Sequence, residues 1–161
     1  MLSTTILEAA AGLLDACRSR GVRLATAESC TGGLIAAALT AIAGASDVVD
    51  RGFITYSNDA KAELLGVPTD IITRHGAVSE EVARAMAAGA LARSRADIAV
   101  SVTGVAGPGG GSFEKPVGLI CFGLARRDHA VISERHIVPG DRTAVRAAAV
   151  AHAFAMIRAL L

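Results

Sequence analysis

The chain has 161 residues, of which 52% are hydrophobic, 19% charged and only 3% aromatic, and its formal net charge is +1. This length fits a single domain, and the high apolar fraction with few charges excludes an intrinsically disordered chain. A charge so close to neutral predicts neither a duplex DNA-binding surface nor binding to an anionic membrane.

Helices and short apolar strands alternate along the chain. Gly21 and Gly66 are predicted to end the first and third helices, while Asn58, Ser79 and Asp141 are predicted N-caps. The alternation predicts a single α/β layered domain over residues 1–161. The two adjacent strands near the end indicate a mixed, mostly parallel sheet flanked by helices. The expected helices span residues 3–20, 34–43, 58–65, 79–93 and 141–161, and the expected strands span 22–27, 51–57, 98–102, 117–125 and 130–138.

The first polar segment, T-A-E-S-C-T-G-G at 26–33, joins a strand to a helix. The Ser29 hydroxyl is expected near the amides of a helix N-terminus, which can stabilise an oxyanion or bind a phosphate. The arrangement resembles a nucleophile elbow, although the GxSxG pattern is absent. Alternatively, Ser29 and Thr31 only cap the helix. Cys30 is a rival nucleophile by type, but without a nearby His or Lys in the sequence it is expected to be a buried structural thiol.

The second segment, Y-S-N-D-A-K, holds the only tyrosine, Tyr56, and one of the two lysines, Lys61. Arginine supplies the other 14 basic residues. A lysine can act as a base when burial lowers its pKa, whereas an arginine cannot. Lys61 is therefore a candidate to accept the Ser29 proton, with Tyr56 relaying or donating one. The alternative is a surface lysine beside a packed tyrosine.

The third segment is the glycine-rich stretch 103–111, which follows an apolar strand. It matches neither the P-loop nor the G-x-G-x-x-G pattern, so no nucleotide cofactor is predicted. It either lets a ligand approach the backbone closely or is a flexible surface loop. At the start of the last helix, Arg142 and Arg146 are candidates for a phosphate or carboxylate, or form a solvated helix face.

Several classes of site and location are not predicted. The three cysteines form no CxxC pair, so we expect neither structural zinc nor disulfides, and a reducing, cytoplasmic compartment. The N-terminus does not resemble a signal peptide, and the longest uncharged run, 29–46, is expected to be a buried helix and not a membrane span. The four histidines show no metal-ligand spacing, so no metal is predicted, and His152 is expected to be a partly buried structural residue. Abundant alanine and glycine favour close-packing faces and a homo-oligomer.

Six motifs occur in an order that resembles one family, the C-terminal domain of the competence/damage-inducible protein CinA, also known as the nicotinamide mononucleotide deamidase (PncC) family. The resemblance covers residues 6–161 without a departure at any motif position. Longer members add an N-terminal molybdopterin-binding-like domain associated with ADP-ribose pyrophosphatase activity, so a stand-alone form without that activity is expected here. The motifs are A-E-S-C-T-G-G (27–33), Y-S-N-x-x-K (56–61), G-A-V-S (76–79), T-G-x-A-G-P-x-G-G (103–111), K-P-x-G (115–118) and G-D-R (140–142).

The resemblance implies hydrolysis of nicotinamide mononucleotide to nicotinate mononucleotide and ammonia, in pyridine nucleotide salvage, without metal or cofactor. It places the nucleophile at Ser29, the base at Lys61 and a proton-relay partner at Tyr56. An amide also needs an oxyanion site and an acid for the departing ammonia. The expected substrate-binding residues are Cys30, Thr31, Gly32 and Gly33 as oxyanion donors, Asn58, Thr103, Gly104 and Gly107 around the ribose or nicotinamide, and Arg142 and Arg146 at the phosphate.

Two other functions remain open from the sequence. The same site can act on another small amide, which a panel of amides would distinguish. The chain can also be a non-catalytic binding domain linked to competence or DNA damage. The near-neutral charge and the scarcity of aromatic residues disfavour nucleic acid as the partner in that second case.

Overall fold

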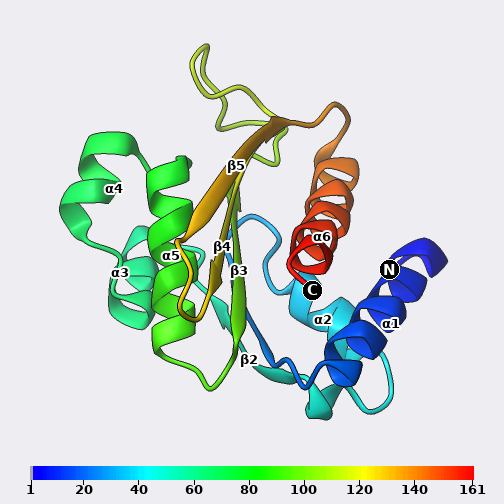
Figure 1. The fold of residues 1–161 in the computed structure, drawn as a ribbon. Coiled ribbons are helices and arrows are strands. Elements are labelled where there is room, and N and C mark those ends of the chain that lie inside the picture. The colour runs from blue at the N-terminus through cyan, green and yellow to red at the C-terminus, as the bar shows by residue number, and fades with distance from the viewer. Residues whose placement is uncertain (1) are drawn as a thin grey trace.

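A five-stranded sheet separates two layers of helices in the computed structural model, which describes residues 2–161 (Figure 1). The strand order is β2-β1-β3-β4-β5. β1 pairs in parallel with β2 and β3, β4 is antiparallel to β3, and β5 is antiparallel to β4. Four of the five strands therefore run in the same direction, which confirms the mixed, mostly parallel sheet. The strands are β1 (Leu24–Glu28), β2 (Val49–Ile54), β3 (Ile98–Gly104), β4 (Leu119–Arg126) and β5 (Ile132–Ile137).

Each face of the sheet is covered by three helices. Two of the three predicted caps are confirmed, at Ser79 and Asp141, and Ser3 caps α1 in the same way: each of these side chains accepts from the amide of the third helical residue. None of the helices within residues 2–161 has the length and apolar character needed to cross a bilayer. On one face lie α1 (Thr4–Ser19), α2 (Leu34–Thr40) and α6 (Arg142–Ala159), and on the other α3 (Asn58–Leu65), α4 (Thr69–His75) and α5 (Glu80–Ala92), while a short 3₁₀ helix (Ala45–Asp47) precedes β2.

The structure differs from the sequence-based expectations around β2 and α3. The strand runs from Val49 to Ile54, earlier than predicted. Ser57, and not Asn58, caps α3: Ser57 is extended and its Oγ accepts from the Ala60 amide at 3.0 Å, while Asn58 is already helical. The helix α4 was not predicted.

Small residues let helix α5 pack very closely on the sheet. A Cβ atom on Gly123 of β4 would overlap the carbonyl oxygen of Ala83, and one on Gly89 would overlap that of Leu65. Ser101 of β3 donates to the same Ala83 carbonyl at 2.6 Å. Much of the abundant alanine is buried in the two layers between helices and sheet.

The carboxyl ends of the three parallel strands meet at one edge of the sheet, where ligand sites of α/β proteins commonly form. Glu28, the last residue of β1, is in register with Ile54 of β2 and Val102 of β3. The segments that follow these strands therefore lie together. They are the three segments that the sequence singled out for chemistry.

Candidate active site

Ser29 and Lys61 meet at this edge of the sheet. Ser29 follows β1 directly, and its amide donates to the Val102 carbonyl of β3 at 2.9 Å, which fixes the residue beside the neighbouring strand. Lys61 comes from the first turn of α3, and its Nζ lies 3.1 Å from the Ser29 Oγ. The same Nζ donates to the Thr55 carbonyl at 2.8 Å. The predicted serine–lysine pair is thus within hydrogen-bonding distance.

Lys61 is buried, with 1% of its surface exposed. No carboxylate within residues 2–161 forms an ion pair with it. Burial lowers the pKa of Lys61, against a smaller opposing effect of the Cys30 thiol. The neutral amine that a general base requires is therefore favoured relative to an exposed lysine. The alternative of a surface lysine is wrong.

Glu28 occupies most of the N-terminus of α2. Its buried carboxylate accepts from the amides of Gly33 at 3.1 Å, Ile35 at 3.0 Å and Ala36 at 2.9 Å. The Gly32 amide donates to the Ser29 carbonyl at 2.9 Å. Gly32 and Gly33 consequently have no free amide for an oxyanion.

Two amides in the same turn have no hydrogen-bond acceptor in another residue. Across residues 2–161, the N–H groups of Cys30 and Thr31 donate to no backbone or side-chain acceptor of another residue. They follow the serine directly in the chain, as oxyanion-hole amides often do in serine hydrolases. Thr31 is fully buried and does not line the cavity around Ser29, so the predicted oxyanion set of four residues is reduced to the Cys30 amide.

A cavity of about 220 Å³ surrounds the serine–lysine pair. Eight of the thirteen residues predicted for the site line it, and they come from the turn after β1, the segment after β2, α3, the end of β3 and the start of α6. Ala77, Val78 and Ala106 complete the lining. The eight are Ser29, Cys30, Tyr56, Asn58, Lys61, Thr103, Gly104 and Arg142.

Arg142 connects the cavity to the start of α6. Its Nη2 donates to the Tyr56 Oη at 2.9 Å and its Nη1 to the Gly107 carbonyl at 3.0 Å. Tyr56 is 60% exposed, so it stands at the rim and not against a packed interior. A second cavity of about 530 Å³ shares Arg142 and Ala106 with the first. Together the two cavities form a continuous lining from the serine to the α6 N-terminus.

The other five predicted residues do not line the serine cavity. Thr31 is fully buried, and Gly107 contributes its carbonyl to Arg142. Arg146 lies behind the turn: its Nη2 donates to the Thr31 carbonyl at 2.8 Å, so it holds the nucleophile turn in place. Gly32 and Gly33 belong to the same turn.

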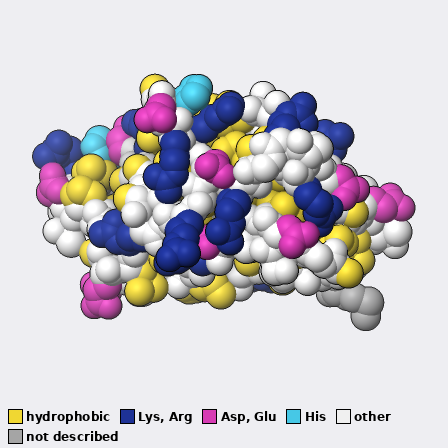
Figure 2. Space-filling model, turned by 60° about the horizontal axis from the view of Figure 1, so that its bottom comes forward, with side chains coloured by type: hydrophobic (Ala, Val, Ile, Leu, Met, Phe, Trp, Pro, Cys, Tyr) yellow, Lys and Arg dark blue, Asp and Glu magenta, His cyan; other side chains and the backbone are white. Residues whose placement is uncertain are grey.

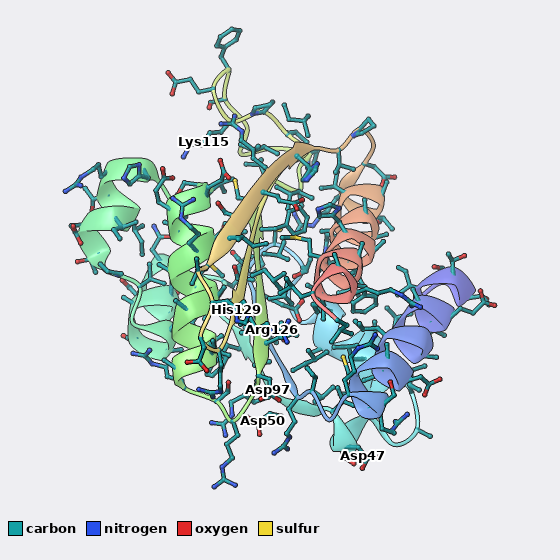
Figure 3. The ribbon with its side chains drawn as sticks, viewed as in Figure 1. Asp47, Asp50, Asp97, Lys115, Arg126 and His129 are labelled. Carbon is teal, nitrogen blue, oxygen red and sulfur yellow. The ribbon has the colours of Figure 1, made fainter. Side chains whose placement is uncertain are left out.

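Some residues contribute to the site through their backbone carbonyls, so their side-chain types could not mark them in the sequence. Thr55 acts through its carbonyl, and the Ala77 carbonyl accepts from the Thr103 Oγ1 at 2.9 Å. Lys115, the second lysine, reaches from the glycine-rich loop to the end of α4, where its Nζ bonds the His75 carbonyl (Figure 3). Glu28 did carry a signal, because a lone carboxylate ending an otherwise uncharged strand before a helix indicates a cap.

All three cysteines are free and buried, and burial was the expectation for Cys30. Burial raises the pKa of the Cys30 thiol to about 11, and those of Cys17 and Cys121 likewise to about 11. A thiol of such pKa is almost wholly protonated at neutral pH and is a poor nucleophile. This disfavours Cys30 as a nucleophile and leaves the Ser29 hydroxyl as the candidate in this cavity.

A family model described as the CinA C-terminal domain matches residues 7–161. The chain belongs to the CinA C-terminal domain family. Among solved structures, this CinA domain is similar to the competence/damage-inducible protein CihA from Agrobacterium tumefaciens, with 51% identity, a TM-score of 0.96 and coverage of 99% and 98% of the two chains. The CinA superfamily protein from Escherichia coli has 36% identity and a TM-score of 0.92, covering 100% of this chain and 94% of that one.

Curated relatives of the domain carry two kinds of name. The nicotinamide-nucleotide amidohydrolase PncC of Escherichia coli strain K12 is 48% identical over 153 residues, which are 95% of this chain and 93% of the relative. The CinA-like protein of Mycolicibacterium gilvum is 52% identical over 141 residues, 88% of this chain. This chain spans about a third of the length of that relative and of other longer ones.

Proposed function

We propose that this chain is a serine amidohydrolase that converts nicotinamide mononucleotide to nicotinate mononucleotide and ammonia, a reaction of pyridine nucleotide salvage. The contact between the Ser29 Oγ and the buried amine of Lys61 carries the proposal. The substrate comes from similarity to relatives named nicotinamide-nucleotide amidohydrolase, which extends over almost the whole of both chains.

In the first half-reaction, the Ser29 Oγ attacks the amide carbon while neutral Lys61 accepts the hydroxyl proton. The carbonyl oxygen becomes an oxyanion, and the amide of Cys30 donates to it. The carbon–nitrogen bond then breaks, and the nitrogen leaves as ammonia with a proton from Lys61, directly or through Tyr56. The products of this step are ammonia and an ester of Ser29.

In the second half-reaction, a water molecule attacks the ester carbon and gives its proton to Lys61. The Ser29 oxygen leaves with that proton, which restores the free enzyme. The product acid is released and loses its proton to water to give nicotinate mononucleotide. The chain's own residues supply the nucleophile, the base and the oxyanion donor. The proposed mechanism therefore requires no metal ion.

The nucleotide part of the substrate needs a cation for its phosphate. Arg142 is the arginine that lines both cavities, and its guanidinium is exposed at the rim. A phosphate at the α6 N-terminus would draw it from the Gly107 carbonyl into a bidentate pair. Thr103 and Gly104 form the opposite wall for the ribose or the nicotinamide ring. Arg146 is assigned to the nucleophile turn and no longer to the phosphate.

The test measures ammonia released from nicotinamide mononucleotide by the purified chain and by Ser29→Ala. We expect loss of turnover with unchanged thermal unfolding, because removing a half-exposed hydroxyl leaves the core intact. Ser46→Ala changes an exposed serine in the 3₁₀ helix before β2. It serves as the matched control and should retain full activity. Turnover by Ser29→Ala would refute the assignment of Ser29 as the nucleophile. If the unchanged chain prefers nicotinamide or nicotinamide riboside over the nucleotide, the assignment of nicotinamide mononucleotide as the substrate is wrong.

A further inference from the structure

A second group of chemically capable side chains lies outside the serine cavity. Glu134 and His136 come from β5, and His152 comes from α6. Their ligating oxygen and nitrogen atoms all lie within 4.8 Å of one another. The sequence did not predict this cluster, because 16 positions and an intervening loop separate the two histidines.

Strand geometry explains why the three meet. Glu134 and His136 are two positions apart on β5, so their side chains point to the same face of the sheet. Helix α6 packs on that face and brings His152 over the buried ring of Phe122, with ring centroids 4.6 Å apart. The two imidazole rings lie 4.3 Å apart, centroid to centroid.

Both imidazoles direct the same nitrogen toward the same oxygen. The His136 Nε2 lies 2.9 Å and the His152 Nε2 2.7 Å from the Glu134 Oε2. An imidazole whose Nε2 carries no proton can bind a metal ion through that nitrogen, and a carboxylate oxygen is a common third ligand.

We propose that Glu134, His136 and His152 form a binding site for a divalent transition-metal ion of the Zn²⁺ and Co²⁺ class. A tetrahedral zinc ion with bonds of about 2.0–2.1 Å keeps its ligand atoms about 3.4 Å apart. The observed separations, 2.7 Å, 2.9 Å and at most 4.8 Å, bracket that value. Two imidazoles and a carboxylate suit zinc, cobalt or nickel and disfavour magnesium and calcium, which prefer oxygen ligands.

The surroundings leave open coordination positions on such an ion. Phe122 closes the inner side, while the side chains of Glu134, His136 and His152 are 41%, 44% and 33% exposed. A largely apolar cavity of about 410 Å³ adjoins both histidines, with Val138 and Ala148 among its lining residues. Three protein ligands with an open side resemble zinc sites that bind water or a small donor ligand.

The proposed metal site is separate from the serine cavity and does not depend on the proposed hydrolase activity. The two cavities share no lining residue. An ion bound here joins β5 to the middle of α6. It should therefore stabilise the fold by mass action, since the ligands are brought together only in the folded chain.

The test titrates Co²⁺ into the untagged, chelator-treated full chain and follows its visible absorption, with Zn²⁺ competition and thermal unfolding as further measurements. We expect one ion per chain, displacement by Zn²⁺, and a higher unfolding temperature with either ion. His136→Ala and His152→Ala should each weaken binding by about tenfold or more, since even loss of an outer-sphere partner of a metal ligand costs roughly 10–100-fold. Glu134→Gln, which keeps the side-chain shape, should weaken it as well.

His75→Ala and His129→Ala are the matched controls, because these histidines lie outside the cluster. Both should bind Co²⁺ as the unchanged chain does. Unfolding of each metal-free variant by circular dichroism separates loss of the ligand from loss of the fold. The proposal is overturned if the unchanged chain binds no stoichiometric ion, or if folded His136→Ala and His152→Ala bind as tightly as the controls.

Discussion

Lys61 shows how the fold changes the chemistry of a single residue. It is among the largest fully buried side chains within residues 2–161, and it bonds only a hydroxyl and a carbonyl. An amine in such surroundings loses hydration without gaining a negative partner, so its neutral form is favoured. A buried lysine of this kind is suited to accept a proton.

Replacing Lys61 with arginine should remove the base while keeping a positive charge. We expect Lys61→Arg to lower kcat/KM by about 10²–10⁴-fold, the usual contribution of a positioned general base. Lys61→Met, which fills the same volume without a charge, should lose activity to a similar extent and remain folded. Ammonia release and thermal unfolding check both variants. Near-normal turnover by Lys61→Arg would exclude the serine–lysine mechanism.

The pH dependence of the reaction should report the same amine. Only neutral Lys61 accepts the Ser29 proton, so kcat/KM should rise with pH through the lowered pKa of Lys61 and then level off. The folded-state pKa lies below the ordinary value of 10.5, so the unfolded chain binds more protons between the two values. Stability should therefore also rise with pH across that interval, and Lys61→Met should remove this part of the dependence. A kcat/KM that falls as pH rises through that interval would contradict the assignment.

The residue types at the serine site could be predicted from the sequence, but their exact partners could not. A serine at a strand–helix junction and an isolated lysine carry chemistry in their type alone. The role of Arg146 could not be predicted, because either a solvated or a buried guanidinium fits its place on α6. Only the structure shows it bonded to the Thr31 carbonyl.

At the scale of the elements, the short helix α2 depends on one buried carboxylate. Glu28→Ala should leave three α2 amides without an acceptor, at a cost of about 2–4 kcal/mol in unfolding free energy. Urea unfolding measures the loss. Ser79→Ala, which removes one capping bond at α5 and one bond to the Gly76 carbonyl, is the control and should cost about 1 kcal/mol. Equal losses in the two variants would show that the three bonds to Glu28 contribute little.

The long helices were predicted well: α1 lies within the expected range 3–20, and α5 and α6 begin after the predicted caps Ser79 and Asp141. The helix α4 was missed because it begins after Pro68, which makes no side-chain capping bond, so no capping signal marks its start. The Glu134, His136 and His152 cluster could not be predicted, because it requires the register of β5 against α6. Local patterns therefore predicted the elements, while pairing between distant elements needed the structure.

Over the whole molecule, acidic and basic side chains are interspersed. Figure 2 shows Lys and Arg side chains beside Asp and Glu on the face that includes the amino ends of the parallel strands. Asp50 lies at this end, opposite the serine cavity, with Asp47 and Asp97 (Figure 3). It pairs with Arg51 at 2.8 Å and with Arg23 at 3.6 Å. The abundance of arginine therefore does not create a uniformly positive surface.

This charge distribution favours the hydrolase over the alternative function of a DNA-binding domain. A protein that binds duplex DNA tightly neutralises several phosphates with unpaired basic side chains, and its affinity then falls steeply with salt. Here Asp50 already pairs with Arg51 and Arg23, so these two side chains are not free to bind phosphates. We expect fluorescence anisotropy with a labelled 20-base-pair duplex to show only non-specific affinity, with a Kd of about 10⁻⁴–10⁻⁶ M or weaker at physiological salt. The same preparation should release ammonia from nicotinamide mononucleotide. Binding in the nanomolar range with a steep salt dependence, in a preparation inactive on the nucleotide, would instead favour the non-catalytic alternative.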